Sequence, residues 1–291
     1  MLFRTGPFLT RLESSLPVLS DTLDLLYGQR PVEAEDQLID FHIQVRRRPG
    51  LRGRLRPQAV FSTDMDTPFY PFPLDQAYPL FEWGLNYCIA MQSHQYLMLH
   101  SAVLEKNGRV LLLPAPPGSG KSTLCAALSY RGWRLLSDEF GLLRPDSGLI
   151  DPLPRPIPLK NRSIDVFKAF EPSAVVGPTY PGTRKGDVAH VHPGEEALRR
   201  WREAARPAWV VFPRFAPDET TRLHDFAKGR AFLKLSGNAF NYPLQGRRGF
   251  HAVDRIIREC STWYLPFRNL DEAVAVLDEL AARSLSDYGG S

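Results

Sequence analysis

The segment that most constrains the fold runs from Pro114 to Glu139 and reads PAPPGSGKSTLCAALSYRGWRLLSDE. An apolar stretch, RVLLL, comes directly before it, and the glycine-rich turn inside it leads into good helix formers that stop at Gly132. WRLLSDE then has the apolar character of a buried strand. A strand–loop–helix–strand unit returns the chain beside its start, so the sequence predicts an α/β fold in which Asp138 lies near the glycine-rich loop.

The glycine-rich turn, GSGKST from Gly118 to Thr123, has the features of a phosphate cradle. Such a cradle needs backbone N–H groups free of side chains at a helix N-terminus. Lys121 would reach the β- and γ-phosphates of ATP, and Ser122 would hold Mg²⁺. Ala115 replaces the usual first glycine, but a small residue there still allows the loop to turn. A chance match is the alternative, and the flanking strand and helix favour an ATP site.

An acidic pair, Asp138 and Glu139, follows Lys121 after a single helix. A carboxylate near the loop can bind Mg²⁺ or take a proton from an attacking hydroxyl. We therefore predict a functional Asp138. A solvated acidic pair at the end of a strand is the alternative, and for Glu139 the two interpretations stay open.

The stretch from His100 to Glu139, HSAVLEKNGRVLLLPAPPGSGKSTLCAALSYRGWRLLSDE, resembles the core of the HPr serine kinase/phosphorylase family. Over nearly its full length, the chain resembles the branch of that family called HprK-related kinase A, which accompanies exosortase and peptide-modification gene clusters. The resemblance implies a P-loop kinase core shared with phosphoenolpyruvate carboxykinase, a mixed sheet flanked by helices. We expect that core over residues 81–291 and a small N-terminal α+β unit over residues 1–80.

The resemblance also implies roles for individual residues. His100 matches the family's active-site histidine, Asp138 its general base, and Glu139 its second aspartate. Lys121 and Ser122 match the nucleotide and metal ligands. The expected catalytic residues are therefore His100, Lys121, Asp138 and Glu139, with Ser122 and Asp138 holding Mg²⁺. We expect His100 to hydrogen-bond Asp138 or a phosphate, and a satisfied core histidine is the alternative.

Two features depart from the family pattern. Thr123 stands where the family has a glutamate after the loop, and PRPIPLKNRSIDVF replaces the signature that follows the core. Cationic side chains in that segment, from Arg155, Lys160 and Arg162, would either clamp phosphates or the acceptor, or face water. The predicted nucleotide-binding set is Pro117, Gly118, Ser119, Gly120, Lys121, Ser122, Thr123, Lys160 and Arg162.

These residues predict ATP-dependent transfer of the γ-phosphoryl group to a hydroxyl, that of Ser or Thr in a peptide or small protein. A kinase acting on a sugar or another metabolite is an alternative, because fold and loop do not encode the acceptor. A non-catalytic adaptor gated by ATP binding is a third.

The composition gives expectations about partners and compartment. A net charge of +4 over 291 residues is too mild to indicate nucleic-acid binding. No apolar run has the length of a membrane span, and the start of the chain lacks the apolar region of a signal peptide. The cysteines are far apart, as in a reducing compartment. We expect a cytoplasmic protein without membrane insertion, and homo-oligomer formation stays open.

Other segments carry weaker signals. Six arginines between Arg46 and Arg56 predict a solvated hairpin around Pro49–Gly50, or else a docking patch for an acidic partner. His190 and His192, on alternate positions, would share a strand face and could begin a zinc site, which no further ligand completes. Arg184 and Lys185 lie in a basic loop that could close over ATP. A third segment, with Asn238, Asn241 and Tyr242, predicts either a structural turn or a pocket for the acceptor.

Overall fold

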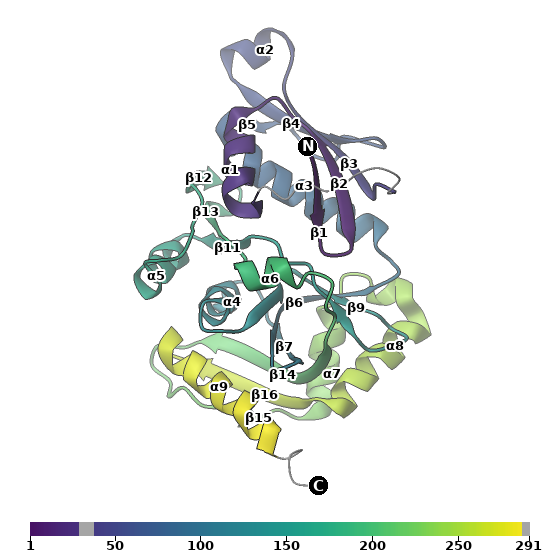
Figure 1. The fold of residues 1–291 in the computed structure, drawn as a ribbon, viewed down its shortest axis with the longest axis vertical. Helices are drawn as coiled ribbons and strands as arrows, with labels where there is room; N and C mark the ends of the chain where they lie inside the picture. The colour runs from purple at the N-terminus through teal and green to yellow at the C-terminus, as the bar shows by residue number, and fades with distance from the viewer. Residues whose placement is uncertain (29–37, 287–291) are drawn as a thin grey trace.

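The computed structural model describes residues 1–28 and 38–286 (Figure 1). Its N-terminal part is a five-stranded sheet in the order β1-β2-β3-β4-β5. The strands are β1 (Leu2–Thr5), β2 (Phe8–Glu13), β3 (Phe41–Arg47), β4 (Gln58–Thr63) and β5 (Phe72–Pro73), with α1 (Pro17–Tyr27), η1 (Leu74–Gln76) and α3 (Ala77–Gln92) beside them. Helix α3 spans the expected boundary after residue 80, and its residues share one hydrophobic core with the N-terminal sheet.

The arginine-rich segment was predicted to form a hairpin around Pro49–Gly50, and that prediction is wrong in detail. Strands β3 and β4 do pair antiparallel, but the short helix α2 (Gly50–Leu55) connects them. Its backbone starts at Gly50 with φ of 86°. Helix α2 lies at the opposite end of the molecule from α9 (Leu270–Ser286) in Figure 1.

The centre of the molecule is an eight-stranded mixed sheet in the order β10-β9-β6-β7-β14-β16-β15, with β8 also paired to β6. The strands are β6 (Leu97–Lys106), β7 (Arg109–Pro114), β8 (Arg134–Ser137), β9 (Phe140–Leu143), β10 (Ile150–Asp151), β14 (Arg206–Phe215), β15 (His224–Asp225) and β16 (Ser261–Phe267). The turn between β6 and β7 uses Asn107 and Gly108 at φ of 54° and 77°, as their sequence predicts.

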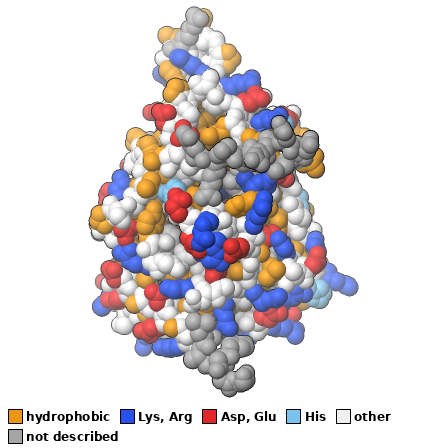
Figure 2. All heavy atoms as spheres, in the orientation of Figure 1, with side chains coloured by type: hydrophobic (Ala, Val, Ile, Leu, Met, Phe, Trp, Pro, Cys, Tyr) orange, Lys and Arg blue, Asp and Glu red, His pale blue; other side chains and the backbone are white. Residues whose placement is uncertain are grey.

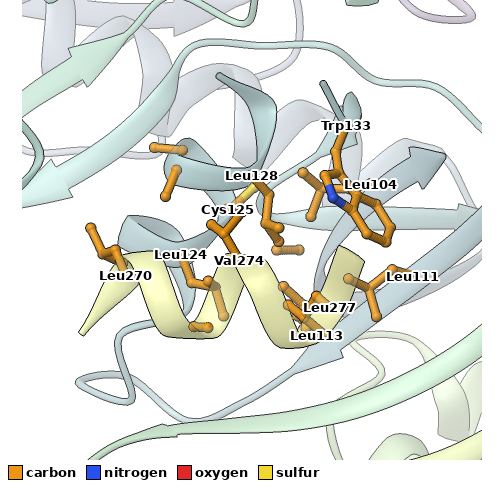
Figure 3. Packing of buried hydrophobic residues seen from close by; sticks show 14 of the residues in the cluster. Leu104, Leu111, Leu113, Leu124, Cys125, Leu128, Trp133, Leu270, Val274 and Leu277 are labelled. Carbon is orange, nitrogen blue, oxygen red and sulfur yellow. The ribbon is translucent and has the colours of Figure 1, made fainter. Parts of the chain in front are cut away.

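Helices cover both faces of this sheet because its strands are apolar on both sides. Leu111 and Leu113 of β7 share a core with α4 (Lys121–Ser129) and α9 (Leu270–Ser286), as Figure 3 shows. Val110 and Leu112, on the opposite face, share a core with α7 (Lys228–Gly237) and α8 (Tyr242–Glu259). The expected α/β class, a mixed sheet flanked by helices, is therefore confirmed.

A small three-stranded sheet joins the two larger parts. It has the order β11-β13-β12, with β11 (Ile157–Lys160), β12 (Tyr180–Thr183) and β13 (Gly186–Val191), and the short helices α5 (Arg162–Phe170) and α6 (Glu195–Arg199) lie nearby. Tyr180 of β12 and Leu153 belong to the same core as α3. The small sheet thus lies against the N-terminal part and next to the central sheet.

The surface carries charges of both signs. On the face drawn in Figure 2, basic and acidic side chains are interspersed rather than gathered in one large field. None of the helices in the described part of the chain has the length and apolar character that a membrane span requires.

Candidate functional site

The glycine-rich loop connects β7 to α4 in a backbone shape that requires glycine. Gly118 and Gly120 have φ of 83° and 85°, in the left-handed region. At Gly120 an added Cβ would also lie 2.8 Å from Cζ of Phe267. Ala115, which replaces the usual first glycine, is buried. The loop is therefore held closely against β16 by its own small residues.

The loop has the features that an anion site needs. Helix α4 begins at Lys121 without a side-chain cap, so its first backbone N–H groups stay available. Nothing lies within 4 Å of the position that a Cβ would take at Gly118. The hydroxyl of Ser119 is buried and has no hydrogen-bond partner among the described residues. A phosphate group fits these residues on chemical grounds.

Asp138 lies beside the first turn of α4. Ser122 Oγ donates a hydrogen bond of 2.7 Å to Asp138 Oδ2, and Lys121 Nζ lies 2.5 Å from the Asp138 carbonyl oxygen and 3.3 Å from Oδ1. The predicted closeness of Asp138 to the loop is confirmed. The chain does not return directly beside β7, however. Strand β8 pairs with β6, so β6 lies between β8 and β7 in the sheet.

A turn fixed by Ser137 directs the acidic pair. Its hydroxyl accepts hydrogen bonds from the backbone N–H groups of Glu139 at 3.3 Å and Phe140 at 3.0 Å. Burial raises the pKa of Asp138 above its usual range, against the opposing effects of the Lys121 ammonium and the Ser122 hydrogen bond. For Glu139, burial raises the pKa, but Lys121, His100 and nearby lysines outweigh it and the net shift is downward. The two neighbouring carboxyls therefore differ in basicity.

His100 is close to the acidic pair but does not take the expected partner. Its Nδ1 lies 3.9 Å from Glu139 Oε1, beyond hydrogen-bond distance, and has no hydrogen-bond partner among the described residues. The ring packs edge-on against Phe240 at 5.2 Å. The expected hydrogen bond from His100 to Asp138 is therefore absent from the described contacts. Burial and the Lys121 charge lower the pKa of His100, which favours a neutral imidazole.

Three cationic residues that follow Glu139 in the sequence, Arg155, Lys160 and Arg162, have different surroundings in the structure. Lys160, at the end of β11, lines a cleft with Asp138 and Glu139. Arg155 lines the same cleft but is buried, with its guanidinium on the Glu82 carboxylate and the Asn86 side chain. Arg162 begins α5, is exposed and does not line the cleft. The structure thus brings Lys160 to the acidic pair and leaves Arg162 outside.

The residues with weaker sequence signals also differ in where they lie. Arg184 lies over the ring of Phe72 and Lys185 over that of Trp83, and Lys185 lines the cleft. Asn241 has a structural role, because its side chain accepts from the Met98 N–H and donates to the Tyr96 carbonyl.

The two histidines considered for zinc have different surroundings. His190 is buried beside Tyr78 and lines the cleft, while His192 Nδ1 accepts from the Gly194 N–H. In the described part of the chain, no three His, Cys, Asp or Glu side chains form a group suited to a metal. Ser122 Oγ and Asp138 Oδ2, 2.7 Å apart, suit Mg²⁺, whose adjacent ligands are about 3 Å apart and which takes its other ligands from phosphate and water.

Sequence reasoning missed the contribution of α3 to the cleft. Glu82, Trp83 and Asn86 line its wall, and Glu82 accepts hydrogen bonds from Tyr27 at 2.6 Å and Tyr78 at 2.8 Å. The available signal was a single acidic residue inside an apolar helix, which indicates a buried charge with a partner.

No protein-family model matches the chain, and no curated protein matches it.

Proposed function

We propose that the chain is a Mg²⁺- and ATP-dependent kinase of the P-loop type found in HPr kinases, which phosphorylates the hydroxyl of Ser or Thr in a peptide or small protein. The observation that carries the proposal is the contact of Asp138 with both Lys121 and Ser122. A glycine-rich loop alone would support nucleotide binding. A carboxylate with a raised pKa at the first turn of the following helix adds a group that can accept a proton.

The contacts of the site residues suggest a role for each of them in phosphoryl transfer. When bound, Mg²⁺–ATP supplies the transferable phosphoryl group. Lys121 would exchange its contact with Asp138 for the β- and γ-phosphates, and Ser122 Oγ and Asp138 Oδ2 would hold the metal. Asp138 Oδ1 would orient the acceptor hydroxyl and take its proton. Glu139 would stay ionised and keep the cations of the cleft in place, with His100 as a neutral neighbour.

A test of the function is to incubate the protein with Mg²⁺ and γ-labelled ATP, together with a cell extract. Label on proteins or peptides supports the proposal, and Lys121→Ala should abolish it. An exposed lysine far from the loop in sequence, Lys228, gives the control variant Lys228→Ala, which should label normally. Tight ATP binding with no transfer to any acceptor would instead favour an adaptor gated by ATP.

A kinase of small metabolites is the second candidate, and one observation favours it. The cleft beside Asp138 is lined on several sides by charged side chains, among them Glu139, Lys160 and Lys185, which could hold the polar groups of a small acceptor. In the same incubation, label that appears on metabolites rather than on protein would support this candidate.

A further inference from the structure

The cleft beside Asp138 draws its walls from distant parts of the chain. Helix α3 supplies Glu82 and Trp83, the turn after β8 supplies Asp138 and Glu139, and β13 with the loop before it supplies His190 and Lys185. Helix α3 runs between the N-terminal sheet and the central sheet (Figure 1). The cleft is therefore a site between the two parts of the molecule, continuous with the proposed catalytic carboxylate.

Three carboxylates and three cations line the cleft, and one of the carboxylates, Asp138, has a further cation, Lys121, from outside the lining. Arg155 is paired with Glu82, and Asp138 is paired with Lys121. Burial lowers the pKa of His190 to about 4, so this side chain is neutral near pH 7. One carboxylate, Glu139, then remains against two ammonium groups, those of Lys160 and Lys185. With Lys121 counted as the partner of Asp138, the cleft and this pair together carry one positive charge in excess.

The two lysines lack a carboxylate of their own. Within the described residues neither forms an ion pair within 4 Å, and the ammonium of Lys185 lies 5.3 Å from the Trp83 ring centroid. Burial, and then the Lys185 charge, lower the pKa of Lys160. Two ammonium groups near each other at the mouth of a partly buried cleft repel each other, and an anion placed between them would relieve that repulsion.

Two residues that line the cleft, Arg155 and His190, each carry a buried polar atom without a hydrogen-bond partner among the described residues. Arg155 uses its two terminal nitrogens on Asn86 and Glu82, but its Nε has no hydrogen-bond partner among the described residues. The same is true of Nδ1 of His190, and both residues are buried. Buried polar groups usually have partners, so these two atoms are exceptions among the residues that line the cleft.

We propose that this cleft is the acceptor site and that it selects an acceptor with a carboxylate or another anionic group close to the reacting hydroxyl, held by Lys160 and Lys185. The inference rests on the proposed kinase function. The acceptor oxygen bonds to the γ-phosphorus as the bond from that phosphorus to the β,γ-bridging oxygen breaks. ADP leaves, and the hydroxyl proton passes to Asp138. The anionic group comes either from an acidic residue beside Ser or Thr, or from a free hydroxy acid.

The experiment compares matched acceptors. Serine-centred peptide libraries carry Asp and Glu, or their neutral counterparts Asn and Gln, at the flanking positions, and L-serine and L-malate represent free hydroxy acids. Transfer from γ-labelled ATP is measured for the wild type, Lys160→Gln and Lys185→Gln. Lys168→Gln is the control, because Lys168 is exposed on α5 and does not line the cleft. ATP affinity is measured by calorimetry for every variant.

We expect acidic acceptors to have a KM about tenfold or more below that of neutral ones, as for a charge contact at a partly buried site. Lys160→Gln and Lys185→Gln should remove most of this preference and leave ATP affinity within about twofold, and Lys168→Gln should behave as the wild type. Preference among peptides alone, or among free acids alone, identifies the source of the anionic group.

Other results separate the two proposals. Transfer that is equally efficient to acidic and neutral acceptors would overturn the acceptor selection and leave the kinase standing. So would a loss of ATP affinity in Lys160→Gln and Lys185→Gln with unchanged acceptor preference, because the lysines would then serve the nucleotide. The absence of both transfer and binding of any acceptor to the ATP-loaded protein would overturn both.

Discussion

Gly120 gives the sharpest prediction about the loop. Gly120→Ala would force an L side chain into the left-handed region, at φ of 85°, at a cost of about 1–2 kcal/mol. It would also place Cβ 2.8 Å from Cζ of Phe267 and 3.2 Å from Cβ of Phe215. Overpacking of this kind adds about 1–3 kcal/mol. The free energy of unfolding should therefore fall by about 2–5 kcal/mol.

The matched control is Gly118→Ala, two residues away in the same loop. Gly118 has nearly the same φ, 83°, but no atom lies within 4 Å of the position that an added Cβ would take. Only the backbone cost of about 1–2 kcal/mol applies there. Urea titrations followed by tryptophan fluorescence give both free energies of unfolding. If the two variants lose the same stability, the contact with Phe267 is not what requires glycine at position 120.

Two further predictions concern the buried polar groups of the cleft. Arg155→Ala leaves Glu82 buried without its cation and should lower the free energy of unfolding by about 3–5 kcal/mol. The same change at Arg248, in an exposed ion pair, should cost less than about 1 kcal/mol, and equal losses in urea titrations would contradict this account. Burial holds the pKa of His190 at about 4, below the value of about 6.5 in an unfolded chain. The unfolded state therefore takes up the proton first as the pH falls, and stability is lost from about pH 6.5 downward until the folded protein also binds it. Between about pH 7 and 5 the wild type should lose about 2 kcal/mol more than His190→Gln, whereas His94→Gln, at an exposed position, should follow the wild type. Parallel stability curves for the wild type and His190→Gln would show that His190 is not buried as a neutral group.

The sequence was sufficient to place Asp138 near Lys121. One helix between two strands leaves few ways to connect them, so the end of β8 had to lie close to the loop that follows β7. The strand order could not be predicted from the sequence. Strand β8 pairs with β6, and the choice of a strand's neighbour depends on contacts between residues far apart in the chain. The Asn107–Gly108 turn was readable since it depends only on local backbone preference.

The cleft was largely hidden from the sequence. Its residues come from positions as far apart as Glu82, Arg155 and His190, and nothing local marks them as neighbours. The lone acid in the apolar helix α3 indicates that Glu82 has a partner, but many arginines could have supplied it. The same limit explains why Arg162 was grouped with Lys160. The two are close in the chain, but only Lys160 lines the cleft.

The central claim is that Asp138 accepts the proton of the acceptor hydroxyl. Asp138→Asn has the same shape and can still accept the hydrogen bond from Ser122, but an amide cannot act as the base. The direct measurement is single-turnover phosphoryl transfer at saturating Mg²⁺–ATP, with ATP affinity measured on the same preparation. We predict that transfer falls by about 10²–10⁴-fold while ATP still binds. Transfer at the wild-type rate by a variant that binds ATP normally would contradict the account.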